Sequence, residues 1–381
     1  MELADLIGLR PLPGAGLLLT LTRRCPLACA HCSTASTMRG EEPDSGRLLR
    51  FVASFTDDNR PDVVMLTGGE PLLLPELAQR LASRAREAGS RTALLSGMFF
   101  ARQRRIPARI MGAITAVDHF SASLDVHHER EVPRSDVFQA VRRILDSGVT
   151  ASFHITGSGP DDPYLAEVTD EVRHVFGDQV PMLVTEVRPM GRAAAWAARP
   201  RPPVDPDRVL PCSAAAWPVV AFDGTVVACC NQDVVDRRPV PDHLRLGHIA
   251  EDDWRAVRQR VLSSPVLRMV RVAGPVRMKA RYGRERTTAP CQGYCGTCRS
   301  LGDEPAVIEA VSRVASGPVG ELLDREAARV QVQDGPVALV RRHGSAPYAD
   351  LVVSAERSPE RGSSEGDVRC AGKHLGGRIA R

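Results

Sequence analysis

The stretch Arg24–Cys32 reads RCPLACAHC and carries Cys25, Cys29 and Cys32 at Cys-x3-Cys-x2-Cys spacing. It follows the apolar run Leu17–Thr22, which has the character of a buried strand. Each iron of a cubane iron–sulfur cluster takes a thiolate ligand, so three thiolates leave the fourth iron free for a substrate. The spacing therefore predicts an iron–sulfur site with one open iron. A structural zinc site is the alternative.

Composition is that of an ordinary globular protein. The chain has 381 residues, of which 43% are hydrophobic and 25% charged, and its net charge of +4 is too small to indicate nucleic-acid binding. Close cysteine triplets are typical of metal ligands, and thiolates that hold iron need a reducing compartment. Neither a signal peptide nor an apolar run of about 20 residues is present, so no membrane contact is expected. We expect a cytoplasmic protein.

Six apolar runs recur along the first half of the chain, with amphipathic helical patterns between them. The runs begin near Leu17, Val63, Thr92, His119, Thr150 and Met182, and the helical patterns include Leu48–Phe55, Leu77–Leu81 and Val137–Leu145. Ser135 is the predicted N-cap of the third helix and Gly148 its stop. A strand–helix repeat of about 30 residues predicts a parallel α/β layer or barrel. The pattern alone does not separate a barrel from a doubly wound sheet.

A second motif, Thr67–Pro71 (TGGEP), ends the second predicted strand. Its two glycines allow a close backbone approach to a ligand. Together with the cysteine triplet it resembles the radical S-adenosylmethionine (radical SAM) superfamily. The resemblance implies a partial (β/α)6 TIM-like barrel and a 4Fe–4S cluster on the three cysteines. It also implies a SAM site in which Gly68, Gly69, Glu70 and Pro71 contact the amino group of the methionine moiety. His31 holds the place of an aromatic-type residue in that family's loop.

Residues at the ends of the later predicted strands are further candidates for the SAM site. The resemblance places Ser123 and Asp125 near the ribose and carboxylate of SAM, although capping of the next helix would explain both residues equally well. Arg188 is a candidate partner for a carboxylate of SAM or of the substrate. Weaker candidates, at the ends of the fifth and sixth predicted strands, are His154, Thr156 and Glu186. The run His127–Glu129 is interpreted as a solvated loop.

A third group of cysteines lies downstream, at Cys212, Cys229, Cys230, Cys291, Cys295 and Cys298. The sequence around Asp223-Gly224 predicts a hairpin that leads into Cys229. The group resembles the SPASM and twitch extensions of radical SAM enzymes, which hold auxiliary iron–sulfur clusters. Six cysteines suit one 4Fe–4S cluster with spare thiols, and we assign as ligands Cys212, Cys229, Cys295 and Cys298, with Cys291 next. A zinc ribbon is the alternative.

These features divide the chain into five parts. Residues 1–195 form the predicted barrel, 196–210 a linker, 211–300 the smaller cysteine-rich domain, 301–335 C-terminal helices, and 336–381 a partly disordered tail.

The predicted enzyme cleaves SAM reductively to a 5′-deoxyadenosyl radical that abstracts hydrogen from a substrate. Maturation of a ribosomally made peptide is the first hypothesis. It would involve a separate leader-recognition protein, because the cysteine triplet begins too near the N-terminus for such a domain to precede it, and an electron donor such as a ferredoxin or flavodoxin. Oxidation or epimerisation of a small molecule, such as a sugar or aminocyclitol, is the second. In an epimerase, Cys230 or Cys291 would return the hydrogen atom. A non-catalytic metal-binding protein is the third hypothesis.

Overall fold

A computed structural model describes residues 1–103, 105–197, 205–283 and 293–354. Its centre is a sheet in the order β6-β5-β4-β3-β2-β1-β7-β8-β9. All neighbours from β1 to β6 pair in parallel, as expected for a partial barrel. These six strands begin at or next to the predicted positions: β1 Gly16–Thr20, β2 Val63–Thr67, β3 Arg91–Ser96, β4 His119–Leu124, β5 Thr150–Gly157 and β6 Met182–Glu186.

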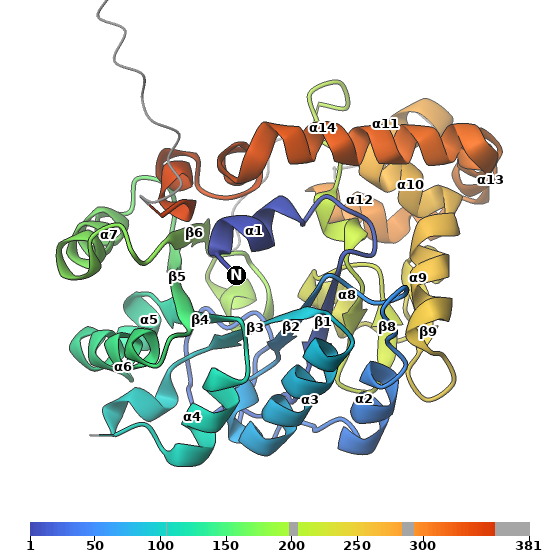
Figure 1. Cartoon of the computed structure of the whole chain (residues 1–381). Coiled ribbons are helices and arrows are strands. Elements are labelled where there is room, and N and C mark those ends of the chain that lie inside the picture. Colours follow the sequence, from blue (N-terminus) through green and yellow to red (C-terminus); the bar gives the residue numbers. More distant parts are fainter. Residues whose placement is uncertain (104, 198–204, 284–292, 355–381) are drawn as a thin grey trace, which may run out of the picture.

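Helices lie between the strands and cover the outer face of the curved sheet (Figure 1). The outer helices are α2 Ser45–Val52, α3 Pro75–Glu87, α4 Ala108–Thr115, α5 Val126–Glu129, α6 Arg134–Asp146 and α7 Pro163–Phe176. β1 and β2 are mostly apolar on both faces, whereas β4 and β5 alternate apolar residues with polar ones, and nearly all residues of the six strands are buried or half-buried. The N-cap of α6 is Pro133, so the prediction of Ser135 was wrong. The helix begins one residue before Ser135, which therefore lies in its first turn.

The sheet continues beyond the six parallel strands. The predicted hairpin forms from β7 Val219–Val220 and β8 Thr225–Val227, and β7 pairs in parallel with β1. A further strand, β9 Arg245–His248, pairs antiparallel with β8. The hairpin therefore extends the same sheet that carries the cysteine triplet.

The C-terminal half of the described chain is mainly helical. Its helices are α8 Gln232–Val235, α9 Trp254–Ser263, α10 Pro265–Val272, α11 Pro275–Tyr282, α12 Gly293–Ser300, α13 Pro305–Ala315 and α14 Gly317–His343, followed by the 3-10 segment η7 Ala346–Val352. Helical structure thus extends past residue 335, where we expected the tail to start. None of the helices in the described ranges is long and apolar enough to cross a bilayer.

One end of the barrel is closed by segments from both ends of the chain. Helix α1 (Leu3–Gly8) packs with the end of α14 and with η7 in an apolar cluster that includes Leu3, Trp217, Val340 and Val352. Val63, the first residue of β2, belongs to the same cluster, so this closed end lies at the start of the strands. The other end, where the strands finish, is left for a site.

Candidate functional site

A cavity of about 450 Å³, here called the mouth cavity, opens at the carboxyl ends of the parallel strands. Loops that follow such strands form the site in most parallel α/β proteins. The predicted residues that line the cavity are Cys25, Cys29, His31, Cys32, Gly68, Gly69, Ser123, Asp125, His154, Thr156, Glu186 and Arg188. The fold therefore brings the cysteine triplet and the glycine pair to one cavity.

The cluster loop, Cys25–Cys32, is held from two sides by side chains far away in sequence. Arg192 donates from Nε to the carbonyl oxygen of Cys29 at 2.8 Å and from a terminal nitrogen to Ser36 O at 2.7 Å. The Trp196 indole donates to Ala30 O at 3.1 Å. On the opposite side, Glu131 accepts from the backbone N–H of Ala28 at 2.6 Å.

The thiols of the loop are close enough to interact electrostatically. Burial and, to a smaller extent, the negative charges of Glu70, Cys29 and Cys32 raise the pKa of Cys25 to about 12, against the opposing effect of a backbone hydrogen bond from Leu27. A bound cation would reverse this effect, because metal binding removes the thiol proton and neutralises the repulsion among thiolates. The three thiols therefore form a set suited to a metal centre.

The two glycines of the TGGEP motif pack against the backbone that leads into the cluster loop. A Cβ on Gly68 would lie 2.4 Å from Thr22 O, and one on Gly69 would lie 2.3 Å from Arg24 O, so this loop packs directly against the backbone that enters the cluster loop. Gly68 also has φ +141°, a conformation that favours glycine.

Glu70 is turned into the protein wall. It accepts hydrogen bonds from Leu72 N at 3.0 Å, Gly97 N at 2.8 Å and the Ser96 hydroxyl at 3.0 Å. Burial raises the pKa of Glu70 to about 7, against the opposing effect of these hydrogen bonds. Neither Glu70 nor Pro71 lines the mouth cavity, although the sequence analysis assigned both to SAM. In this structure the Glu70 side chain joins the turn after the motif to the end of β3.

Asp125 caps the next helix, which is one of the two roles considered from the sequence, and it also lines the mouth cavity. It follows β4 and caps α5, accepting from the N–H groups of His127 and His128 at 2.9 Å each. Its other oxygen lies 3.3 Å from Nε2 of His31 and accepts from Nδ1 of His128 at 2.5 Å. Burial alone would raise the pKa of Asp125, but the two imidazoles and the helix N–H groups lower it to about 2.

His128 was expected in a solvated loop, and that interpretation was wrong. Its side chain is only 13% exposed and lines the mouth cavity. Burial would lower the pKa of His128, but Asp125 and a hydrogen bond with the Cys29 side chain raise it to about 10. The signal in the sequence was the spacing Asp125-x-x-His128, which places both side chains on one side of a short helix.

His31 has the opposite electrostatic character. Burial lowers its pKa to about 4, which favours a neutral ring. The ring stacks on His127 at 5.0 Å between centroids, and its Nδ1 is buried with no hydrogen-bond partner among the described residues. His31, Asp125 and His128 also offer ligand atoms within 4.8 Å of one another. The contacts of both rings with Asp125 account for this proximity without an ion.

Five downstream cysteines gather at a second place. The charges of Cys212, Cys230, Cys295 and Cys298 each raise the pKa of at least one other member of the group, and Cys229 is among the residues affected. Burial raises the pKa of Cys212 and Cys229, and raises that of Cys298 to about 12. The eight cysteines within the described ranges are all free thiols. Cys291, assigned as a further ligand, lies outside the described residues.

Local structure explains how these thiols come together. Cys212 precedes the 3-10 turn η4 Ser213–Ala216, and its N–H donates to Val270 O in α10. The thiol of Cys229 accepts from Asn231 N at 3.3 Å. Cys295 and Cys298 are three residues apart in α12 and share one face of it.

A side cavity of about 490 Å³ adjoins this second group. Cys295 and Tyr294 line it, and Arg188 and Met190 line both this cavity and the mouth cavity. Cys230 also faces the mouth cavity, where its thiol accepts from Arg10 at 3.2 Å. The segment that follows β6 therefore forms a wall common to both cavities.

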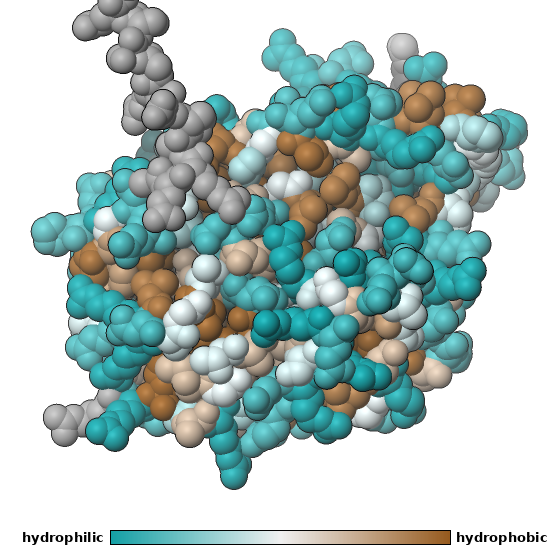
Figure 2. All heavy atoms as spheres, in the orientation of Figure 1, coloured by the Kyte–Doolittle hydropathy of each residue, from teal (hydrophilic) through white to brown (hydrophobic). Residues whose placement is uncertain are grey.

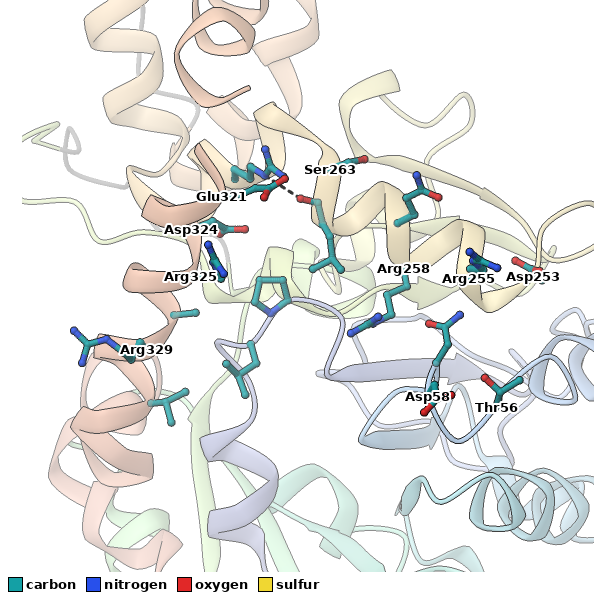
Figure 3. Close-up of a pocket in the computed structure, with 18 of the residues that line it drawn as sticks. Thr56, Asp58, Asp253, Arg255, Arg258, Ser263, Glu321, Asp324, Arg325 and Arg329 are labelled. Carbon is teal, nitrogen blue, oxygen red and sulfur yellow. Dashed lines mark hydrogen bonds and ion pairs between the residues drawn. The ribbon is translucent and has the colours of Figure 1, made fainter. Parts of the chain in front are cut away.

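A larger hollow of about 1290 Å³ lies elsewhere, between α9, α14 and the loops before β1 and β2 (Figure 3). Charged side chains such as Arg258, Glu321 and Arg325 line it, whereas no cysteine or glycine of the two motifs does. It lies at the starts of β1 and β2, away from the mouth cavity. Apolar side chains gather over neighbouring parts of α14 (Figure 2), where Val319 is 66% exposed.

Residues 19–172 match the model of the Radical SAM superfamily. This part of the chain, from β1 into α7, contains both motifs. No curated protein matches the chain.

Solved structures resemble the chain at low identity. SuiB of Streptococcus suis bound to S-adenosylmethionine is 12% identical over 64% of this chain and 65% of its own length, with a TM-score of 0.46. BtrN in complex with AdoMet and 2-DOIA is 12% identical over 68% of this chain and 87% of its own, with a TM-score of 0.36. Coproporphyrinogen III oxidase (HemN) of Escherichia coli is 13% identical over 50% and 48%, with a TM-score of 0.34. Similarity at this level does not transfer a substrate.

Proposed function

We propose that the chain is a radical SAM enzyme whose cluster is held by Cys25, Cys29 and Cys32. The observation that supports this most directly is that the three thiols and the Gly68–Gly69 turn face one cavity at the carboxyl ends of parallel strands. When bound there, a 4Fe–4S cluster supplies the electron for reductive cleavage of SAM to a 5′-deoxyadenosyl radical that abstracts hydrogen from the substrate. The residues of the chain bind and orient SAM and shield the site from water.

The residues present fit these two groups. The cluster loop offers three thiols in a buried setting, and an open iron needs no fourth cysteine. Polar groups for SAM stand around the same cavity: Ser123 and Asp125 after β4, and Arg188 after β6. The neutral ring of His31, with its unpartnered buried Nδ1, offers a flat surface and a hydrogen-bonding atom for a nucleobase.

We further propose an auxiliary iron–sulfur cluster on Cys212, Cys229, Cys295 and Cys298, in a SPASM- or twitch-like region spanning residues 211–300. Support comes from the mutual proximity of these thiols and from the N–H of Asn231, which donates to Cys229 as backbone groups do to cluster ligands. Cys291 remains a candidate ligand. Cys230 lies near these thiols but is not in the proposed ligand set, because it is exposed and lines the mouth cavity, and it keeps its proposed role as a hydrogen-atom donor in an epimerisation.

A peptide is the proposed substrate. Arg188 and Met190 border both the mouth cavity and the side cavity, so an extended substrate could contact both. This arrangement favours a peptide over a compact sugar or aminocyclitol. We also propose two partners. One is a separate leader-binding protein, and the other is a low-potential electron donor such as a ferredoxin or flavodoxin.

Anaerobic reconstitution with iron and sulfide, followed by dithionite and SAM, tests the enzyme proposal. We expect 5′-deoxyadenosine from the wild type and none from Cys29→Ser. Iron content should fall by about half in Cys212→Ala/Cys298→Ala, because four ligands hold one cubane. Zinc in either site, or intact SAM under strong reductant, would overturn the corresponding proposal.

Incubation with candidate peptides and with aminocyclitols, read by mass spectrometry, separates the two substrate classes. Turnover of an aminocyclitol with no peptide modified would reverse our preference. Loss of epimerised product in Cys230→Ala, with 5′-deoxyadenosine still formed, would support the hydrogen-donor role.

A further inference from the structure

The hollow between α9 and α14, here called the rear hollow, lies at the starts of the strands, at the opposite end from the mouth cavity. Side chains of the two helices and of the loops around Pro13 and Asp58 line it (Figure 3). Its volume of about 1290 Å³ exceeds the roughly 300–1000 Å³ of most small-molecule pockets. A hollow of this size suits an extended ligand better than a compact one.

Three arginines in the rear hollow have no partner for their charge. Arg255 and Arg258 come from α9 and Arg325 from α14, and no ion pair of these side chains is found within the described ranges. Arg258 projects from α9 toward the middle of the hollow (Figure 3). Unpaired guanidinium groups on two facing helices indicate a ligand that carries carboxylates or other anions.

Arg258 is held in place although its guanidinium has no partner. A Cβ on Gly14 would lie 3.3 Å from Cγ of Arg258, so the stem of this side chain packs against the loop before β1. Its Nε is buried and has no hydrogen-bond partner in the part of the chain that the structure describes. A buried donor without an acceptor destabilises the folded chain, so this arginine is more easily explained by a ligand than by folding.

The acidic residues of the rear hollow are occupied, with one exception. Glu321 and Asp324 each form an ion pair with an arginine of α10, and Asp253 caps the N-terminus of α9. Asp58, an exposed residue of the loop before β2, is the one lining acid for which the described residues show neither kind of partner. The unpaired charges are therefore mainly positive, which favours an anionic ligand.

Apolar side chains lie beside these charges. Leu12, Pro13, Leu262, Ala328 and Val332 line the same hollow. They favour a ligand that has apolar as well as acidic groups. No aromatic side chain is among the described residues that line the hollow, so these residues offer no stacking surface for a nucleobase.

We propose that the rear hollow is a docking site for an extended acidic segment of a partner protein. The arginines would bind its carboxylates through paired N–H groups, and its apolar residues would lie in the groove between the helices. The C-terminal sequence of the chain itself, residues 355–381, is a poor complement, because it contains six Arg and Lys against four Asp and Glu. The inference does not rest on the chemistry proposed for the mouth cavity.

Binding of a model peptide to the full-length chain tests this inference. The peptide is fluorescently labelled, has about twelve residues, long enough to lie along such a groove, and is composed of glutamate and leucine with glutamate in the majority. Fluorescence anisotropy measures its dissociation constant. We expect saturable binding that weakens as salt is added, because salt screens the attraction between charges. A peptide with lysine in place of glutamate should not bind.

Charge-reversal variants test whether the peptide lies in the rear hollow. Arg255→Glu/Arg325→Glu changes two exposed residues and should raise the dissociation constant at least about tenfold, because like charges then face each other. The matched control, Arg105→Glu/Arg173→Glu, makes the same change in net charge at exposed positions outside the hollow and should bind as the wild type does. Arg258→Gln should also weaken binding. If Arg258→Gln does not fold, the double variant decides the question.

Hydrogen–deuterium exchange supplies a second readout of where the peptide binds. The acidic peptide should slow exchange of the backbone amides in α9 and in the first half of α14. Exchange in the cluster loop should not change, since that loop lies at the other end of the strands. Protection confined to the cluster loop would overturn the proposed location.

Four further results would overturn the inference. They are no binding of the acidic peptide, equal binding of the lysine peptide, unchanged affinity in Arg255→Glu/Arg325→Glu, and displacement of the peptide by inorganic pyrophosphate as effectively as by unlabelled peptide. The last result would indicate a site for small anions. None of them bears on the proposed enzyme function, because Arg255→Glu/Arg325→Glu should form 5′-deoxyadenosine from SAM as the wild type does.

Discussion

The guanidinium of Arg192 donates to the carbonyl oxygen of Cys29 at 2.8 Å, from a position 163 residues further along the chain. The N–H of the same residue donates to Cys32 O at 3.0 Å. A Cβ on the preceding Gly191 would lie 2.4 Å from Cys32 O, so glycine is needed for this approach. The segment after β6 therefore fixes the shape of a loop that follows β1.

Loss of the Arg192 side chain should loosen the cluster loop. We expect Arg192→Ala to lower the free energy of unfolding by about 2 kcal/mol, since hydrogen bonds from a charged donor are lost, and to reduce iron retention after reconstitution. Arg192→Lys should recover only part of the effect, because lysine lacks the planar fork that reaches two carbonyl groups. Urea unfolding and iron assay check both variants. Arg39→Ala, at an exposed arginine nearby, is the control, and an equal loss there would contradict the assignment.

A side chain at position 69 should displace the glycine turn from the cluster loop. The Cβ of Gly69→Ala would lie 2.3 Å from Arg24 O, a distance that backbone atoms must relieve by moving apart. We expect SAM affinity, measured by equilibrium dialysis on the reconstituted protein, to fall at least tenfold. Gly8→Ala introduces the same atom where nothing lies within 4 Å, and it should bind SAM as the wild type does. Unchanged affinity in Gly69→Ala would contradict the role of the turn.

Glu70 should make stability depend on pH. Its pKa rises from 4.5 to about 7 on folding, so between these values the unfolded chain releases the proton while the folded chain keeps it. The contribution of Glu70 is therefore complete below about pH 4.5 and is lost as pH rises through 7, by up to about 3 kcal/mol. In Glu70→Gln this loss should be absent.

Urea titrations of the metal-free chain at pH 5 and pH 8 measure the effect. The exposed Glu309→Gln is the control and should follow the wild type at both values. A wild-type curve that declines no faster than that of Glu70→Gln would rule out a proton on the buried carboxyl.

A buried ion pair joins the two helices α10 and α14. Arg271 donates to both oxygens of Asp324 at 2.8 and 2.6 Å, and the two side chains are 4% and 8% exposed. Arg271→Met leaves the Asp324 carboxylate buried without its charged partner and should lower the free energy of unfolding by about 3–5 kcal/mol. Arg271→Met/Asp324→Leu should cost less than the single change.

The comparison variant for this pair is Arg329→Met on the exposed side of α14, where the ion pair with Glu326 faces water. It should unfold at nearly the wild-type urea concentration. Equal destabilisation at both positions would contradict the prediction that burial makes the loss of Arg271 more costly.

The sequence predicts the barrel strands well because each is an apolar run set off by helical patterns. Val63 and Thr150 begin strands as expected. It does not predict that β7 pairs with β1, since two residues, Val219 and Val220, carry that pairing and nothing local specifies a partner so distant. The second cysteine group is gathered by such long-range contacts, including that of Cys212 with Val270.

The site shows the same division. The cysteine spacing and the glycine pair indicate which residues gather, because their chemistry is local. The direction in which each side chain points depends on residues outside the motif. Glu70 turns inward because Ser96 at the end of β3 and Gly97 just after it offer donors there. His128 looks like a polar surface residue until α5 folds it against Asp125 and Cys29.

The parallel ladder between β1 and β7 has a mechanical consequence. The loop that follows β1 and Cys229, two residues beyond β8, are both anchored to one backbone-bonded framework. Moving the thiols of the cluster loop away from Cys229 would break hydrogen bonds between the strands. If the two proposed clusters occupy these sites, electron tunnelling between them would therefore cover a constant length.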